Sequence, residues 1–375
     1  MSRFIITCGS TGGHLSPGIA LAEGLSARGH ECRLLISRKE IDGRLSTGYP
    51  ELSFERVPGT GFGWRPVALL RCVRSQIRAF FHCLRLLREV RPDAIVAFGG
   101  FTSVPPILAG WLLGIPGALH EGNRIPGLAV RLLGRFCRRV YLPPGLRLAS
   151  VGSATTRHVG LPVRREIRRR PMAAARASLG LDPNHRVLVV LGGSQGAAAL
   201  NEWARASLPS LAAAGIQVYC LTGPGKGREG RVNLHTETGV PIDALFTPFS
   251  DRMADILSAA DLVVARAGAG TLAELVRCGT PAVLVPYPKA KDDHQSANAE
   301  DFARHGGGLV VPQAELGRLA TVVQETIAND WLLRRCRENL RRMERANLLE
   351  LILDDLEEIV IEHGASRRRA PQPVA

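Results

Sequence analysis

The chain of 375 residues is longer than one hydrophobic core usually organises, and 45% of its residues are apolar, which is enough to fill two cores. Its formal net charge of +14 favours an anionic partner, although charge alone does not distinguish nucleic acid, an anionic membrane surface and an acidic ligand. No signal peptide is recognised and no apolar run approaches the roughly 20 residues that span a bilayer, so we expect any membrane contact to be peripheral.

The eight cysteines are scattered and lie mostly in apolar surroundings, which indicates small buried side chains in a reducing cytoplasm. No Cys-x-x-Cys pair and no Cys/His spacing of a zinc site occurs. The chain also lacks an Asp-x-Asp pair, which commonly holds a divalent ion on a sugar-nucleotide diphosphate. We therefore expect neither a metal nor another cofactor.

One pattern occurs twice along the chain: an apolar strand, a glycine-rich turn and an amphipathic helix. The first copy starts at Phe4 and continues through the turn 9–17 to about Arg28, and the second starts at Val187 and continues through the turn 192–200. Each copy is typical of the opening of a Rossmann-type half.

Apolar strands then alternate with helical stretches, which predicts parallel sheets with helices on both faces. In the first half the further strands are predicted over 32–36, 94–98, 116–120 and 139–142. In the second half they are predicted over 217–221, 244–247, 262–266 and 282–286. A long helix is predicted over 66–90. The sequence thus predicts an α/β protein with two Rossmann-like domains that face a cleft.

A charged, proline-bounded stretch at 161–176 marks the expected hinge. We expect a first domain over 1–160 and a second over 161–342. An apolar last helix over 343–363 is expected to cross back to the first domain, and the tail 364–375 has the composition of disorder.

Both glycine-rich turns lead from a strand into a helix N-terminus, where free N–H groups and the helix dipole favour a phosphate. Neither turn has the Gly-Lys-Ser/Thr ending of a Walker A loop or the Gly-x-Gly-x-x-Gly pattern of dinucleotide enzymes. A tight connection without a ligand explains either turn equally well by itself. Two equivalent turns facing one cleft favour binding.

Two further loops carry polar groups at strand ends in the second half. Glu274 follows the glycines of the loop 265–275, where its carboxylate could accept both hydroxyls of a ribose or could be a first-turn acid that stabilises the helix dipole. Gln295 and Asn298 follow the strand 282–286 and could bind sugar hydroxyls. The alternative there is an ordinary helix start capped by Asp292 or Asp293.

Two side chains are candidates for the general base. His14 ends the first phosphate-type turn, and an imidazole can take a proton from an alcohol near neutral pH. Its alternative role is a hydrogen bond to the loop backbone. Glu121, in the sequence LHEGN at 119–123, lies at another strand end of the same half and is the second candidate.

The ordered motifs STGGHLSPGIALA, GGFTSVPPILAGWLLGIP, LHEGN, VGLPVR, LGGSQGAAALN, AGAGTLAE and DDHQSANA resemble those of the MurG family. This family adds N-acetylglucosamine to undecaprenyl-diphospho-N-acetylmuramoyl-pentapeptide, converting lipid I to lipid II of the bacterial cell wall. The resemblance covers nearly the whole chain and implies the GT-B fold. It further implies that the second domain binds UDP-N-acetylglucosamine, while the first faces the membrane and the lipid acceptor.

Carried over by motif, the resemblance implies a diphosphate near Thr11, Gly12 and Gly13. It places the donor sugar at Asn123 and Gln295, and the nucleotide at Arg164. Ser194 would contact the diphosphate, and Ser250 the uracil through its backbone. The nucleotide would also be lined by Ala269, Gly270, Thr271, Leu272, Ala273 and Glu274, with Glu274 on the ribose.

The implied mechanism is a single inverting displacement. His14 by first preference, or Glu121 by second, removes the proton of the acceptor C4 hydroxyl, and UDP leaves with its charge stabilised by loop amides and helix ends. Ser10, Phe101 and Gly122 depart from the family pattern, which has glycine, tyrosine and glutamine there. Gly122 could weaken a polar contact near the acceptor.

The segment 64–91 mixes arginines with leucine, phenylalanine and tryptophan, as an interfacial basic helix does. A domain-packing helix with a basic solvent face is the alternative. We expect an anionic membrane surface as a partner, on the cytoplasmic face of the cell membrane. No nucleic-acid module is recognised, so no nucleic-acid partner is expected. Another GT-B transferase with a different acceptor, a UDP-N-acetylglucosamine 2-epimerase and a non-catalytic sugar-nucleotide binder stay open as alternative functions.

Overall fold

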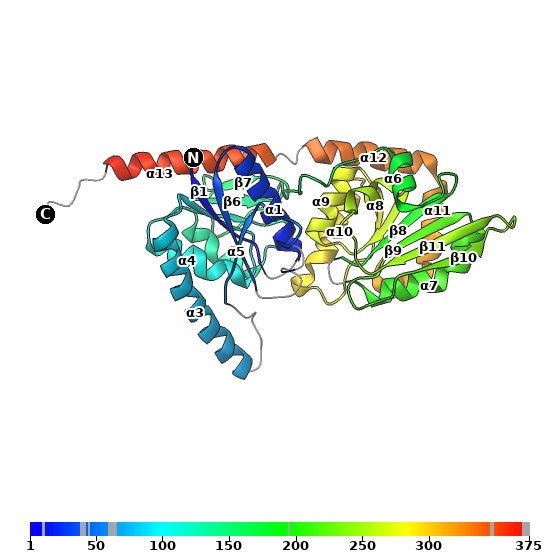
Figure 1. The fold of residues 1–375 in the computed structure, drawn as a ribbon, viewed down its shortest axis with the longest axis horizontal. Helices are drawn as coiled ribbons and strands as arrows, with labels where there is room; N and C mark the ends of the chain where they lie inside the picture. Colours follow the sequence, from blue (N-terminus) through cyan, green and yellow to red (C-terminus); the bar gives the residue numbers. More distant parts are fainter. Residues whose placement is uncertain are drawn as a thin grey trace. The chain divides into compact units, whose positions relative to one another are not determined.

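A computed structural model describes residues 1–9, 12–37, 43, 46–58, 66–193, 196–345 and 349–369. The chain forms two compact units (Figure 1). Unit 1 comprises Met1–Gly122, Pro126–Arg164 and Asn347–Ala375, and unit 2 comprises Asn123–Ile125 and Arg165–Ala346. The chain therefore changes unit after Arg164, and the short segment Asn123–Ile125, expected in the first domain, belongs to the second unit.

Unit 1 is built on a parallel sheet with the strand order β3-β2-β1-β4-β5-β6-β7. Its strands are β1 Arg3–Thr7, β2 Glu31–Ile36, β3 Ser53–Arg56, β4 Ala94–Ala97, β5 Gly117–His120, β6 Arg139–Leu142 and β7 Thr156–His158. Its α-helices are α1 Gly12–Ala27, α3 Pro66–Val90, α4 Val104–Leu112, α5 Leu128–Leu133 and α13 Leu349–Arg369, with short 3-10 turns at Phe101–Ser103 and Gly134–Phe136.

The side chains of β1 contribute to both cores of unit 1, because successive side chains of a strand point to opposite faces of the sheet. Phe4 and Ile6 are buried with the apolar residues of α1 and α13. Ile5 is buried on the other face, with α3 and α4. Layers of helices on both faces are the reason why these strands are nearly continuously apolar.

Unit 2 is also built on a seven-stranded sheet, with the strand order β10-β11-β9-β8-β12-β13-β14. Its strands are β8 Arg186–Leu191, β9 Ile216–Leu221, β10 Gly230–His235, β11 Pro241–Thr247, β12 Leu262–Ala265, β13 Ala282–Leu284 and β14 Gly308–Val310. Its α-helices are α6 Met172–Leu179, α7 Ala198–Ala213, α8 Met253–Ala259, α9 Ala269–Cys278, α10 His294–Arg304, α11 Leu319–Ala328 and α12 Asp330–Arg345, with 3-10 turns at Lys291–Asp293 and Gln313–Arg318. The predicted pair of α/β domains with parallel sheets is confirmed, with one departure: β10 pairs antiparallel with β11.

The end of the chain differs from the expectation of one helix over 343–363 and a disordered tail from 364. α12 ends at Arg345, and α13 continues to Arg369. α13 is anchored in unit 1 by buried Ile352, Leu353 and Leu356. A helix that is anchored in this way propagates readily through alanine and arginine, which have high helix propensity, and this explains the added turns.

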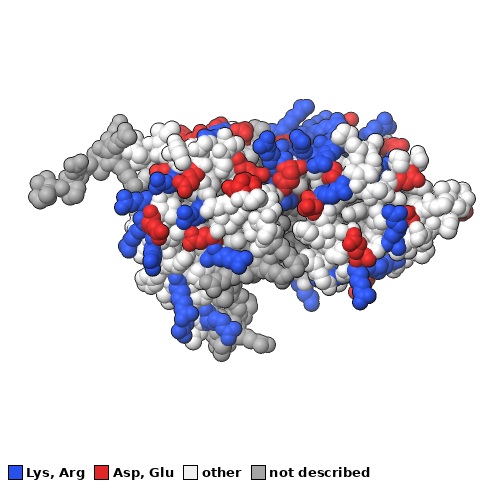
Figure 2. Space-filling view, viewed as in Figure 1, with Lys and Arg blue, Asp and Glu red and all other residues white. Residues whose placement is uncertain are grey.

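α12 gives unit 2 a strongly basic surface. Its sixteen residues include arginines at 334, 335, 337, 341, 342 and 345. Figure 2 shows blue side chains gathered along this helix. Leu333, Cys336 and Leu340 of α12 are buried, so the helix packs on unit 2 through one apolar stripe. The arginines at 334, 335, 341, 342 and 345 are exposed, whereas Arg337 is half-buried.

Candidate active site

In unit 1, the loops after β1 and β4 meet where the strand order reverses direction, the place where open α/β sheets bind ligands. Thr102 Oγ1 donates to the carbonyl of Gly9 over 2.8 Å, which ties the two loops together. Gly99 has a φ of +82°, and His14 Nε2 lies 3.9 Å from the position that a Cβ on Gly99 would occupy. His14, on the first turn of α1, is therefore beside the glycine pair of the second loop.

Glu121 is buried, and its Oε2 accepts a hydrogen bond from the backbone N–H of Gly127 over 2.8 Å. Gly127 is the N-cap residue of α5 and has no side chain to cap that helix. The carboxylate thus closes the loop 121–127 and lies near the positive end of α5. This position gives Glu121 a structural role that the sequence pattern did not suggest.

His120 precedes Glu121 and is fully enclosed. Its Nε2 lies 2.9 Å from the carbonyl of Gly160, to which it donates, and its ring stacks on Phe98 at a centroid distance of 5.3 Å. Burial lowers the pKa of His120 to about 4, so the ring is neutral at physiological pH. Arg164 is also held within unit 1, where its Nη1 donates to Tyr49 Oη over 3.0 Å.

In unit 2, the corresponding reversal of strand order lies between β8 and β12. The six residues 269–274 form the start of α9, and all are half-buried. The N-cap residue is Gly268, no side chain caps the helix, and no acid lies in its first turn. The first N–H groups of α9 can therefore bind an anion. The interpretation of Glu274 as a first-turn acid is wrong, because Glu274 is the sixth residue of the helix.

Asn298 on α10 is a buried polar residue, 3% exposed, that connects the loop before α9 to the segment Asn123–Ile125 by hydrogen bonds. Its Nδ2 donates to Asn123 Oδ1 over 3.0 Å and to the carbonyl of Ala267 over 3.1 Å. Its Oδ1 accepts from the backbone N–H of Arg124 over 2.8 Å. The amide therefore fixes the segment Asn123–Ile125 to the loop before α9, whereas the sequence suggested that it contacts a sugar.

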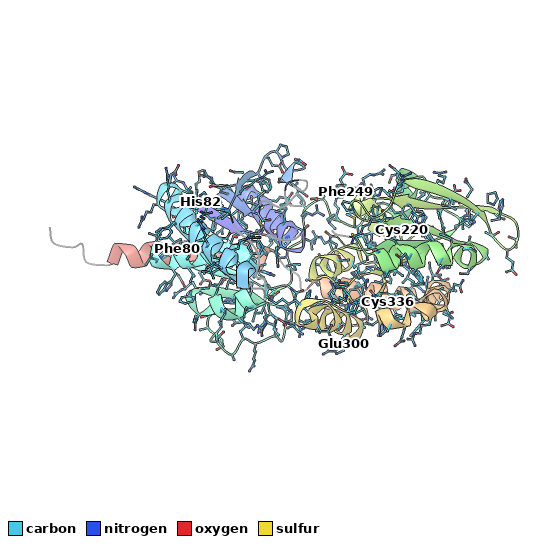
Figure 3. The ribbon with its side chains drawn as sticks, turned by 90° about the horizontal axis from the view of Figure 1, so that it is seen from below. Phe80, His82, Cys220, Phe249, Glu300 and Cys336 are labelled. Atoms are coloured by element: carbon cyan, nitrogen blue, oxygen red, sulfur yellow. The ribbon has the colours of Figure 1, made fainter. Side chains whose placement is uncertain are left out.

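Gln295 lies on the first turn of α10, the helix that carries Glu300 in Figure 3. Its Oε1 accepts from the backbone N–H of Tyr287 over 3.0 Å, which fixes the orientation of the side-chain amide. Ser250 follows Phe249, which Figure 3 labels, in the loop between β11 and α8, and its Oγ accepts from the backbone N–H of Arg252 over 3.1 Å.

The turn before α10 is strained. Asp292 and Asp293 have φ values of +52° and +50°, in the left-handed region that non-glycine residues rarely adopt. Asp293 occupies the N-cap position of α10, but its side chain makes no capping bond to the backbone and accepts instead from Ser296 Oγ over 2.6 Å. Asp293 therefore does not form the expected ordinary cap, and strain of this kind often marks ligand sites.

Thr11 and Ser194, both implied by the resemblance, lie outside the described residues. Gly12 and Gly13 are the first two residues of α1. Within the described part of the chain, no group of three or more His, Cys, Asp or Glu residues could hold a metal ion. None of the eight cysteines forms a disulfide bond, and burial raises the pKa of Cys32, Cys83, Cys137, Cys220 and Cys278 to about 12.

Comparison with known proteins shows similarity over nearly the whole chain. Residues 4–142 match the glycosyltransferase family 28 N-terminal domain, and residues 187–350 match the glycosyltransferase family 28 C-terminal domain. A UDP-N-acetylglucosamine--N-acetylmuramyl-(pentapeptide) pyrophosphoryl-undecaprenol N-acetylglucosamine transferase from Opitutus terrae is 57% identical over 98% of this chain and 97% of its own. The protein of the same name from Parasynechococcus marenigrum is 36% identical over 96% of this chain and 100% of its own.

Solved structures agree with this relationship. The crystal structure of Acinetobacter baumannii MurG is 25% identical, covers 95% of this chain and 99% of its own, and superposes with a TM-score of 0.69. The glycotransferase of kitacinnamycin, 17% identical over 96% of this chain and 99% of its own, has a TM-score of 0.70 and shares the fold. The fold is therefore GT-B, and the chain belongs to the MurG family of glycosyltransferases.

Proposed function

We propose that this chain transfers N-acetylglucosamine from UDP-N-acetylglucosamine to the C4 hydroxyl of undecaprenyl-diphospho-N-acetylmuramoyl-pentapeptide, with inversion at the anomeric carbon. The proposal rests on one observation: a relative whose name states this sugar donor and this lipid acceptor is 57% identical over 98% of the chain. The product is lipid II of peptidoglycan synthesis. A transferase with another lipid acceptor and a 2-epimerase are the competing functions.

Unit 2 binds the donor in this proposal. The uncapped N-terminus of α9 suits the diphosphate, and Glu274 suits the ribose hydroxyls. Asn123 and Gln295 are each oriented by a hydrogen bond within unit 2, to Asn298 and to Tyr287. Amide groups with fixed orientations can distinguish an N-acetylated sugar from one without the acetamido group, because a mismatched donor leaves them unpaired.

His14 is the preferred base. Glu121 Oε2 already accepts from the Gly127 N–H, so this oxygen is engaged in closing the loop 121–127 and is less available to a substrate hydroxyl. His14 lies on the first turn of α1 beside the glycines of the next loop, where an acceptor can approach the backbone. It removes the C4 proton as the hydroxyl attacks C1, and helix N-termini stabilise the negative charge on the departing UDP.

α3 supplies the membrane contact. Leu70, Val73, Ile77 and Phe81 recur at helical spacing and are 47% to 71% exposed. Arginines flank this stripe at 71, 74, 78 and 85. In Figure 1 the first turns of α3 extend beyond the sheet of their own unit. An exposed apolar stripe with flanking arginines fits the headgroup region of an anionic bilayer. None of the described helices is long and apolar enough to cross a membrane.

The deciding experiment measures transfer of labelled N-acetylglucosamine from its UDP donor to a short-chain lipid I analogue, with EDTA present. Formation of the labelled disaccharide-lipid is expected, with UDP released in equal amount. Donor consumption with free or epimerised sugar, and no labelled lipid, would favour the epimerase. Donor binding without transfer to lipid I would point to another acceptor.

A further inference from the structure

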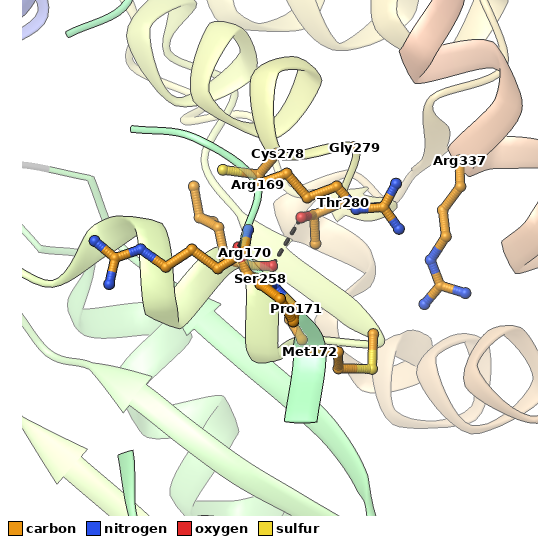
Figure 4. A pocket seen from close by; sticks show the side chains of 11 residues that line it. Arg169, Arg170, Pro171, Met172, Ser258, Cys278, Gly279, Thr280 and Arg337 are labelled. Carbon is orange, nitrogen blue, oxygen red and sulfur yellow. Dashed lines mark hydrogen bonds between the residues drawn. The ribbon is translucent and has the colours of Figure 1, made fainter. Parts of the chain in front are cut away.

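Unit 2 contains a cavity of about 420 Å³ that is formed by residues outside the candidate donor site. Arg169 and Arg170 line it from the segment that leads into α6, Met172 lines it from the start of α6, and Arg337 lines it from α12 (Figure 4). Leu257 of α8 contributes an apolar wall. A volume in this range is typical of a site for a small organic ligand.

The cavity also lies at the far end of the helix that carries the candidate donor residues. Cys278, the last residue of α9, and the following Gly279 line it. The ten residues of α9 separate its two ends by about 15 Å, because an α-helix rises about 1.5 Å per residue. A ligand here would therefore not occupy the position of the sugar nucleotide.

Positive charge around the cavity is not matched by carboxylates. Arg337 pairs with Asp261 at 3.8 Å, but this carboxylate is already paired with Arg176 at 2.6 Å and Arg186 at 3.4 Å. Asp330, the other carboxylate near Arg337, pairs with Arg186 at 2.6 Å. Burial lowers the pKa of Arg337, and although Asp261 raises it, Arg169 and Arg186 lower it further by repulsion.

The second carboxylate near the cavity is also shared. Asp255 accepts from Arg170 Nη1 over 2.8 Å and pairs with Arg252 at 3.2 Å. Arg169 is exposed and makes no hydrogen bond or ion pair among the described residues. The guanidinium groups thus outnumber the carboxylates, which leaves a net positive field at the cavity.

Backbone donors add to this field. The N-cap residue of α6 is Pro171, which has no side-chain oxygen, and the first turn of α6 contains no acid. The backbone N–H of Ala175 is the first to bond within the helix, to the carbonyl of Pro171. The N–H groups that precede it in the first turn have no partner within the helix, and Pro171 and Met172, at this helix end, line the cavity.

We propose that this cavity is a second ligand site of unit 2, which binds a phosphate ester. The phosphate contacts Arg169, Arg337 and the N-terminus of α6, and the organic part contacts Met172 and Leu257. Arginine favours phosphate because its planar fork donates two parallel hydrogen bonds. The ester is carried either by a small soluble molecule or by the headgroup of an anionic lipid.

Met172 allows a direct test, because the chain has only four methionines. In protein labelled with ¹³C at the methionine methyl groups, the Met172 signal, assigned with Met172→Leu, reports on this cavity and not on the donor site. Titration with glycerol 3-phosphate in the presence of saturating UDP is expected to shift this signal to a plateau. The signals of Met253 and Met343 act as internal references.

Three arginine variants test whether the ester binds in this cavity. Arg169→Gln and Arg337→Gln should each weaken binding about tenfold, the usual effect of losing one charged hydrogen bond. Arg168→Gln, an exposed neighbour that does not line the cavity, should bind as the unmodified protein does. Because Arg169 has an exposed side chain, its variant keeps the test valid if Arg337→Gln folds poorly.

Vesicles distinguish the two sources of the ester. If sedimentation with phosphatidylglycerol vesicles depends on Arg169 and Arg337, and glycerol 3-phosphate leaves Met172 unshifted, the ligand is a lipid headgroup. If glycerol 3-phosphate binds and sedimentation is equal in all variants, the ligand is soluble. The proposal is overturned if Met172 does not shift at about 10 mM ester, where a Kd of about 1 mM would be nearly saturated, and sedimentation is also independent of both arginines. A shift of equal affinity in all variants overturns it as well.

Discussion

The Nδ2 group of Asn298 donates to Oδ1 of Asn123 over 3.0 Å, although the two residues are 175 positions apart in the chain. The same buried amide bonds the carbonyl of Ala267 and the N–H of Arg124. One side chain therefore determines where the segment 123–125 lies relative to the loop before α9. It acts as a positioning residue for the donor sugar if Asn123 contacts that sugar.

Replacing this amide should impair use of the donor. Asn298→Ala removes three hydrogen bonds and is expected to raise the KM for UDP-N-acetylglucosamine about tenfold or more, because Asn123 loses its fixed orientation. Asn339→Ala on α12 is the matched control, since it removes a side-chain hydrogen bond to the carbonyl of Gly306. An unchanged donor KM in Asn298→Ala, with a folded protein, would contradict the positioning role.

The sequence predicted the central strands and missed the edges of both sheets. β3, β7, β10 and β14 are the four edge strands, and none was predicted. The strand TRH of β7 and the strand SFER of β3 are short and contain polar or charged residues, and β10 is mostly exposed. Hydrophobic patterning detects strands that are covered by helices on both faces, and edge strands lack this signal.

The candidate site was predictable to the extent that it depends on local motifs. The glycine turns and the start of α9 follow directly from strand, turn and helix signals in the chain. The hydrogen bonds of Asn298 and Glu121 were not predictable, because each depends on where the chain returns after a loop. An amide or a carboxylate at a strand end has the same sequence signature whether it contacts a ligand or a backbone N–H.

The choice of base can be tested by two substitutions of unequal effect. His14→Ala should reduce turnover by roughly 10²–10⁴-fold while donor affinity changes little. Glu121→Gln should retain most activity, because the amide oxygen can still accept from the Gly127 N–H. Steady-state kinetics at saturating donor would measure the turnover of both variants. If Glu121→Gln loses as much turnover as His14→Ala is expected to lose, and His14→Ala stays active, the assignment is reversed.

His120 should make unit 1 sensitive to mild acid. Burial places its pKa at about 4 in the folded protein, below the ordinary 6.5, so the unfolded chain binds the proton first as the pH falls. The stability contributed by the neutral ring is complete above about pH 6.5 and is lost as the pH falls toward 4. Between pH 7.5 and 5 this loss should be about 2 kcal/mol.

Urea unfolding of the unmodified protein and of His120→Gln at the two pH values isolates this contribution. Glutamine can donate to the Gly160 carbonyl but does not titrate. The free energy of unfolding should therefore fall less with pH in the variant. Equal pH dependence in both proteins would show that His120 is accessible to protons in the folded state.

The attachment of α13 should depend on Asp355. Its Oδ1 accepts from Arg139 Nε over 2.9 Å and its Oδ2 from Tyr141 Oη over 2.8 Å, and Asp355 is 8% exposed. Asp355→Ala leaves the buried Arg139 guanidinium with only the longer pair to Glu358, at 3.7 Å, and should destabilise unit 1 by about 3 kcal/mol. Glu362→Gln removes the exposed pair with Arg138 and should cost at most about 1 kcal/mol. Chemical denaturation of both variants measures the difference, and equal values would contradict the buried network.

The apolar stripe of α3 should determine affinity for membranes. Phe81→Glu replaces a side chain that is 63% exposed and should weaken binding to vesicles containing phosphatidylglycerol about tenfold or more, because an inserted ring is replaced by a charge that the anionic surface repels. Ile361→Glu, on the exposed surface of α13, is the matched control and should bind normally.

Salt should weaken vesicle binding of the unmodified protein, because it screens the attraction between the flanking arginines and the anionic lipids. Activity toward a water-soluble acceptor should be equal in all three proteins, since unit 2 and His14 are unaffected. Equal vesicle binding of Phe81→Glu and Ile361→Glu would instead assign α3 to a contact with protein.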